Sequence, residues 1–325
     1  MNQYETSWTE LNFIETELTQ IYSLDTLSAH EIKWFVFECS AENQWICDVN
    51  QVVMDFGGVF HSIFLRWAVT VNGLYVAAEK YQSGEWLEGG HTFSVSGIRK
   101  SHDGTPEFVP VRVWDGQIAA SIHESSVPML AGWAFCNMYS CLEEFIFKIF
   151  RLYLEAHPLE ICDGREFGEL RRAYRERERS EEKRNEWHTL WAERLESWHR
   201  KKVYKGIEKV FIHFCEKTGI KIPSGYKNKD KFDYSDIART LGGIALIRNC
   251  FIHGVTTVPQ ELEDFCSDFR GLFFRFNAGE KFQITIQDLA TLEYFTDTFT
   301  TTLNLSLFEL IYPGMTDPKN LNLPE

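Results

Sequence analysis

The stretch SCLEEFIFKIF, residues 140–150, decides the fold. Its apolar side chains recur at three- and four-residue spacing, at Leu142, Phe145, Ile146, Ile149 and Phe150. This spacing is typical of a helix with one strongly apolar face. A second apolar helix is expected from Ile237 to about His253, and a third over residues 287–311. The second part of the chain, residues 126–325, is therefore predicted to be an all-α bundle.

The helix that ends near His253 carries its own boundary signals. Ser235 or Asp236 can cap its start, because these side chains accept hydrogen bonds from free backbone amides. Gly254 can end it, because glycine readily takes the left-handed conformation that closes a helix.

A highly charged segment, about residues 160–209, interrupts the predicted bundle. Its acidic and basic residues alternate at helical spacing, which predicts a solvated helix or helix pair inserted between the apolar helices. Trp187, Trp191 and Trp198 lie within it, interleaved with arginine and lysine. The tryptophans could stack RNA bases, or they could simply pack on the bundle, and packing is the favoured interpretation.

The first part of the chain, residues 1–125, has a different pattern. After a stretch of helical character at residues 5–23, residues 32–122 contain short runs rich in Val, Ile, Phe and Trp, separated by turn residues. Asn72-Gly73 and Asp115-Gly116 are typical hairpin turns. We expect a β-rich accessory or regulatory domain here, which makes the predicted fold class α+β.

Composition limits the possible classes of protein. The chain has 325 residues with a net charge of −14, and residues 1–125 alone carry −11. With 44% hydrophobic residues it has ample material for a core, so a largely disordered chain is excluded. The acidic balance argues against a general nucleic-acid coat, although a local basic site is still possible.

The same inventory predicts where the protein resides. The sequence contains no run of about 18 apolar residues, so no membrane span is expected. The N-terminus lacks the pattern of a secretory signal. The 8 cysteines are scattered without a close Cys-x-x-Cys pair, so we expect buried free thiols rather than disulfides or a zinc site. A cytoplasmic location follows as the expectation.

The stretch IALIRNCFIHG, residues 244–254, carries the candidate chemistry. It is apolar except at Arg248, Asn249 and His253, and a buried helix keeps such side chains only where they meet partners. Arginine presents a fixed set of donors to phosphate oxygens, and histidine can transfer protons near neutral pH. The pair therefore suits phosphodiester cleavage. Concerted acid and base catalysis needs a second histidine, which a symmetric partner would supply.

Arg248-Asn249 followed by His253-Gly254 resembles the RNxxxH/RxxxxH signature of HEPN domains, the higher eukaryote and prokaryote nucleotide-binding helical bundles. The helix containing SCLEEFIFKIF is similar to the first long HEPN helix with its Leu-Glu pair. The resemblance covers at most residues 126–325, with the charged insertion between the two matching helices. Residues 1–125 match nothing that we can name.

The resemblance implies a metal-independent endoribonuclease that works as a homodimer and needs no cofactor. Two facing motifs would cut RNA through attack by the 2′-hydroxyl, as in toxin–antitoxin or anti-phage defence systems. Arg248 would then orient the scissile phosphate, His253 would be general acid or base, and Asn249 would position the phosphate or the partner histidine. Glu143, which points toward apolar surroundings, is the predicted buried acid that holds Arg248.

Several alternatives stay open at this level. Arg248 and His253 could be structural groups of an inactive scaffold that binds RNA, nucleotide or a protein partner. The acidic first part could also mimic nucleic acid in an antitoxin-like or adaptor protein, or recruit a regulatory protein. An RNA path is predicted along the basic run 200–209, which includes Arg200, Lys201 and Lys202, and over the lysine-rich loop with Lys227 and Lys229, although a solvated face explains both as well. No metal site is predicted, since His188 and His199 lack ligand spacing.

Overall fold

The computed structural model describes residue 36 and residues 39–203, 205–223, 233–268 and 274–317. These residues are mostly helical, with one small antiparallel β-hairpin. The first elements are helices α3 (Gln44–Gln82) and α4 (Gly84–Glu88), strands β1 (Thr92–Lys100) and β2 (Pro106–Asp115), and helix α5 (Gly116–Ala156). Two short 3₁₀ turns follow, η1 (Pro158–Ile161) and η2 (Arg165–Phe167). The remaining helices are α6 (Gly168–Glu176), α7 (Glu181–Val203), α8 (Ile207–Thr218), α9 (Tyr234–Ile252), α10 (Gln260–Ser267) and α11 (Ile286–Ile311).

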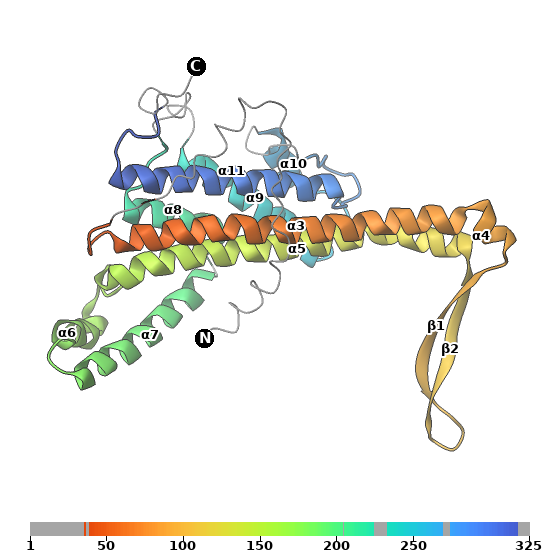
Figure 1. Ribbon diagram of the computed structural model, residues 1–325, viewed down its shortest axis with the longest axis horizontal. Coiled ribbons are helices and arrows are strands. Elements are labelled where there is room, and N and C mark those ends of the chain that lie inside the picture. The colour runs from red at the N-terminus through yellow and green to blue at the C-terminus, as the bar shows by residue number, and fades with distance from the viewer. Residues whose placement is uncertain (1–35, 37–38, 204, 224–232, 269–273, 318–325) are drawn as a thin grey trace.

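Helices α3 and α5 run side by side along the length of the molecule and are joined at one end through α4 and the β1–β2 hairpin (Figure 1). Helix α11 lies against α3 on one side of this pair, with α8 and α9 nearby, while α6 and α7 form a separate helix pair at the other end of α5 (Figure 1). The hairpin projects away from the helical body and leaves apolar side chains exposed, among them Ile98, Phe108 and Val113.

The core is centred on α5, whose apolar face was predicted from residues 140–150. The Phe145 ring stacks on Phe56 of α3 with ring centroids 4.1 Å apart, and it meets Phe299 of α11 edge-on. One turn further along α5, Phe150 packs edge-on against Phe214 of α8 and against Trp198 of α7. Helix α5 therefore connects the helices that follow it into one hydrophobic cluster.

The predicted β-rich N-terminal domain is wrong. Residues 44–82, which include three of the expected strands and the Asn72-Gly73 turn, form the single helix α3. The buried positions Val49, Val53, Phe56, Phe60 and Ile63 follow each other at three- and four-residue spacing, and this period prevails over the β-propensity of each residue. Among the described residues, the only paired strands of a sheet are β1 and β2, which form the antiparallel hairpin.

The second hairpin turn is also absent, because Asp115 begins a helix instead. Its carboxylate accepts a hydrogen bond from the Ile118 amide at 2.9 Å and caps α5. Helix α5 then runs without a break past residue 125, so the domain boundary placed at 125/126 falls inside this helix. The expected helical stretch at residues 5–23 lies outside the described residues.

The cysteines also differ in part from the expectation. Cys39 and Cys47 form a disulfide that links the start of α3 to the segment before it, so these two are not free thiols. Among the described residues the other six are free, and five of them are buried. Burial raises the pKa of the Cys141 thiol to about 12.

One helix among the described residues, α3, is long and apolar enough to cross a membrane by length and composition, with a mean hydropathy of 1.3 over its best window. A core helix can meet the same criteria, and the first half of α3 packs in the core described above.

Candidate functional site

The candidate site lies at the C-terminal end of α9. The helix begins at a capping box, in which Asp233 accepts hydrogen bonds from the Ser235 and Asp236 amides and the Asp236 carboxylate accepts one from the Asp233 amide. It ends at Ile252, with His253 as its C-cap residue. The predicted helix is thus confirmed, and its cap is Asp233 rather than Ser235 or Asp236.

The predicted stop at Gly254 is confirmed in detail. Gly254 has φ +66°, and its amide donates to the Phe251 carbonyl at 3.1 Å, while the Val255 amide donates to the Cys250 carbonyl at 2.9 Å. These two bonds form a Schellman motif, which requires a residue in the left-handed conformation just after the cap. The motif fixes the backbone at His253, whose side chain is exposed.

The Arg248 side chain is partly buried. Its Nη1 donates to the Asn249 Oδ1 at 2.9 Å, and its guanidinium carbon lies 5.6 Å from the centre of the Tyr139 ring on α5, within the range of a cation–π contact. Its Nε is buried and has no hydrogen-bond partner among the described residues. A buried donor without a partner is costly, which makes this N–H an unusual feature of the site. The rest of the half-buried guanidinium reaches the surface beside the exposed Asn249.

Glu143 does not pair directly with Arg248 among the described ion pairs. Instead, Glu143 accepts a hydrogen bond from the Tyr139 hydroxyl at 3.2 Å. Burial, and then the charge of Glu143, raise the pKa of the Tyr139 hydroxyl, so this group stays a donor at all physiological pH values. Tyr139 thus contacts both residues: its hydroxyl bonds to Glu143, and its ring lies near the Arg248 guanidinium. Sequence reasoning missed Tyr139, although its position four residues before Glu143 on one helix face was a usable signal.

Among the described residues, no hydrogen bond joins the side chains of Arg248 and His253. Both side chains come from the C-terminal end of α9. Helix α9 brings Arg248, Asn249 and His253 to the same end of the bundle, and Tyr139 and Glu143 of α5 support Arg248 from beneath.

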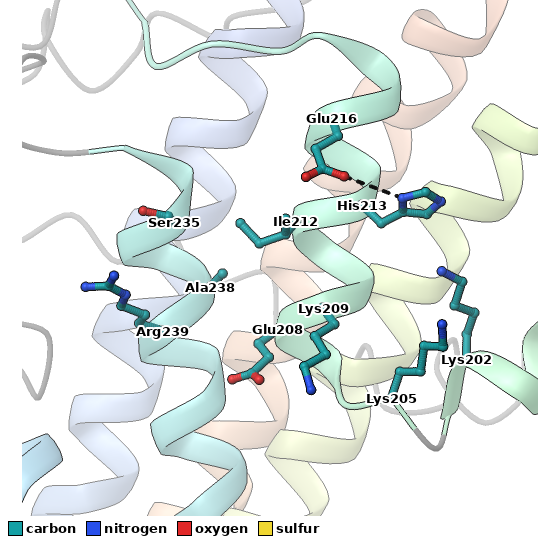
Figure 2. Close-up of a pocket in the computed structure, with 10 residues that line it drawn as sticks. All are labelled: Lys202, Lys205, Glu208, Lys209, Ile212, His213, Glu216, Ser235, Ala238 and Arg239. Atoms are coloured by element: carbon teal, nitrogen blue, oxygen red, sulfur yellow. Dashed lines mark ion pairs between the residues drawn. The ribbon is translucent and has the colours of Figure 1, made fainter.

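A groove runs along α8 and α9 beside this site. One cleft of about 440 Å³ is lined by Glu208, Arg239, Leu246, Asn249 and Phe265, with six further residues of the same helices and α10. A second cleft of about 450 Å³ adjoins it and shares Glu208 and Arg239. Figure 2 shows this second cleft, with side chains from the end of α7 and from α8 and α9 around it.

The second cleft gathers basic side chains. Lys202, Lys205, Lys209 and Arg239 line it, together with His213 and two glutamates (Figure 2). His213 faces Glu216, with 3.6 Å between Nδ1 and Oε2, and burial followed by nearby Lys202 lowers its pKa. His213 also lies against Phe150, as expected for a histidine packed on the core.

The predicted RNA path along the basic run 200–209 meets the second cleft at Lys202, Lys205 and Lys209. Lys202 lines the cleft, whereas Arg200 and Lys201 do not, and Arg200 lies 3.7 Å from Glu196 on the exposed face of α7. Lys227 and Lys229 lie outside the described residues. Sequence reasoning missed Arg239, since only the packing of α8 against α9 brings it next to the basic run 200–209.

The tryptophans of α7 pack on the bundle, as favoured. Trp187, Trp191 and Trp198 are each less than 8% exposed, and the first two stack with ring centroids 5.3 Å apart. Their rings are therefore too buried for RNA bases to stack on them. Among the described residues, no cluster of three or more His, Cys, Asp or Glu side chains could hold a metal ion.

Comparison with known proteins adds no relative. No protein-family model, no curated protein and no solved structure matches this chain.

Proposed function

We propose that the protein is a metal-independent endoribonuclease of HEPN type, acting as a toxin or anti-phage effector. The observation that carries the proposal is the half-buried Arg248 guanidinium beside the exposed Asn249, about one helical turn from an exposed His253 at a fixed helix end. A guanidinium that reaches the surface is suited to a phosphate oxygen, and an exposed imidazole is suited to proton transfer.

In this mechanism the 2′-oxygen of RNA forms a bond to phosphorus while the bond from phosphorus to the 5′-oxygen breaks. One imidazole takes the proton of the 2′-hydroxyl, and a protonated imidazole gives a proton to the leaving 5′-oxygen. The products are a 2′,3′-cyclic phosphate and a 5′-hydroxyl. Arg248 stabilises the charge that develops on the phosphate. Each chain supplies one His253, so two copies provide the acid and the base.

The test is cleavage of mixed RNA by the purified protein in excess EDTA. We expect cutting by the wild type and a loss of at least about a hundredfold in both Arg248→Ala and His253→Ala, since proton transfer and charge stabilisation each contribute on this order. Arg172→Ala and His188→Ala change exposed residues of α6 and α7 and serve as matched controls with wild-type activity. Full activity in both site variants would remove the assignment, and cutting that appears only after a metal is added would overturn the mechanism.

A second function is supported by the contacts of Arg248. Its bond to Asn249 and its position over the Tyr139 ring are contacts that a purely structural arginine also makes. The alternative is a non-catalytic HEPN-like module that binds RNA, nucleotide or a protein partner, as an adaptor or antitoxin. Tight RNA binding without any cleavage in the assay above, or a protein that co-purifies with the chain, would favour this function.

A further inference from the structure

The groove along α8 and α9 connects two chemically different ends. Its two clefts share Glu208 and Arg239, so they form one continuous surface. One end reaches Asn249, the neighbour of Arg248, and the other end reaches Lys202 and His213. Asn249 thus lies at one end of a groove whose opposite end is basic, and Arg248 and His253 are its neighbours on α9 rather than lining residues.

The basic end is unusual for this chain. Lys202, Lys205, Lys209 and Arg239 make no ion pair with a carboxylate in the part of the chain that the structure describes. Burial, and then the charge of Lys205, lower the pKa of the Lys202 ammonium. These four cations outnumber the two glutamates that line the same cleft, Glu208 and Glu216, so the cleft carries a net positive charge that favours an anion.

The neighbouring helix pair shows the contrast. On α6 and α7 the basic side chains of Arg179, Lys183 and Arg184 each lie within 3.1 Å of a glutamate. Those pairs are exposed and contribute little to stability. In each pair, however, the glutamate neutralises the cation that would otherwise attract an anionic ligand. Among the described residues, the four cations of the second cleft lack such pairs.

Apolar side chains line parts of both clefts, and the charged side chains of Glu208 and Arg239 lie where the two clefts meet. Ile212, Ala238, Leu246 and Phe265 line the groove, and Phe265 lies against Gly243, where a Cβ would meet its ring at 2.2 Å. Unstacked bases bind to apolar and aromatic side chains while cations hold the backbone. A duplex, whose bases are paired inside, would leave this apolar surface unused.

We propose that the groove between α8 and α9 holds a single RNA strand, with phosphates on Lys205, Lys209 and Arg239 and the strand leading to Asn249. The proposal rests on the proposed ribonuclease function for the identity of the strand. It adds a binding surface outside the RxxxxH motif and gives the direction in which the substrate approaches it.

The experiment measures binding separately from cleavage. In the full chain carrying Arg248→Ala and His253→Ala, a fluorescein-labelled single-stranded 20-nucleotide RNA is titrated and followed by anisotropy at several salt concentrations. Adding Lys205→Gln, Lys209→Gln and Arg239→Gln should weaken binding about tenfold or more and reduce the salt slope by about 2, since each phosphate contact to a single strand contributes about 0.7. The three residues are exposed, so their replacement leaves the core intact.

The matched control is the triple variant Arg172→Gln, Arg179→Gln, Arg184→Gln on α6 and α7, which loses the same charge. It should bind the RNA within about twofold of the parent, because its residues make no contact with RNA bound in the groove. If net charge alone controlled binding, both triple variants would lose the same affinity. Lys205→Arg with Lys209→Arg should keep the affinity. Circular dichroism and thermal unfolding confirm that each variant folds.

The outcomes separate the two proposals. If the groove variant binds RNA as tightly as the control does, the groove proposal is wrong, even if the wild type cleaves RNA. If the groove variant loses binding but the wild type never cuts RNA, the groove proposal stands and the ribonuclease function fails. Tighter binding of a 20-base-pair RNA duplex than of the single strand would also overturn the proposal.

Discussion

At the scale of single residues, Tyr139 and Gly132 on α5 determine how the end of α9 is held. Tyr139 places its ring under the Arg248 guanidinium and its hydroxyl on Glu143. Gly132, two turns earlier, accommodates the Phe251 ring, which comes two residues before His253. A Cβ on Gly132 would lie 1.9 Å from that ring. The absence of a side chain at residue 132 therefore lets the two helices approach each other beside the candidate site.

Gly132→Ala should lower the free energy of unfolding by about 1–3 kcal/mol, because overpacking a buried contact forces side chains or backbone to move. Gly58→Ala on α3 is the control, since nothing lies within 4 Å of its new Cβ, and it should gain about 0.5–1 kcal/mol. Urea unfolding measures both variants. The packing argument fails if Gly132→Ala is as stable as Gly58→Ala, and the loss should shrink in a Phe251→Leu background.

At the scale of elements, α9 is specified at both ends by its own sequence. The capping box at Asp233 and the Schellman motif at Gly254 leave few unpaired backbone groups at either end. Strands were harder to predict, because Val, Ile and Trp favour strands locally but are equally suited to a buried helix face. Residues 44–82 have this ambiguity, and the partner helix α5 resolves it in favour of α3.

Asp233→Ala should destabilise the protein by about 0.5–2 kcal/mol through loss of the helix cap. The hydrogen bond from Ser235 lowers the pKa of the Asp233 carboxyl, so its contribution is present above the unfolded pKa and is lost as pH falls through the folded value. Asp233→Asn should keep most of the stability at neutral pH while losing this acid dependence, because asparagine caps nearly as well. Urea unfolding at pH 7 and pH 3 separates the three proteins, and an alanine variant as stable as the wild type would contradict the cap.

At the scale of the whole molecule, the proposed chemistry requires two copies. A chain that carries one His253 in the motif cannot supply both an acid and a base from it. A symmetric dimer would bring two α9 ends together, and it would place the two basic grooves on either side of the shared site.

Light scattering should therefore find a dimer at micromolar concentration. Inactive His253→Ala chains mixed with wild type under conditions that allow exchange should suppress cleavage as the square of the wild-type fraction, because only dimers with two intact motifs are active. His188→Ala chains should leave the activity of the mixture unchanged. A strictly monomeric species that still cleaves RNA, or a linear fall in activity, would contradict the shared site.

The sequence by itself determined the helices whose apolar period is long and whose ends carry local signals. These include the 140–150 face of α5, the end of α9 at Gly254 and the last helix, because period and capping depend only on neighbours along the chain. Only the tertiary structure decided that residues 44–82 form one helix, that Tyr139 lies between Glu143 and Arg248, and that cations from α7, α8 and α9 share a groove. These features depend on which faces of distant segments meet, and packing free energy, summed over the whole core, selects that arrangement.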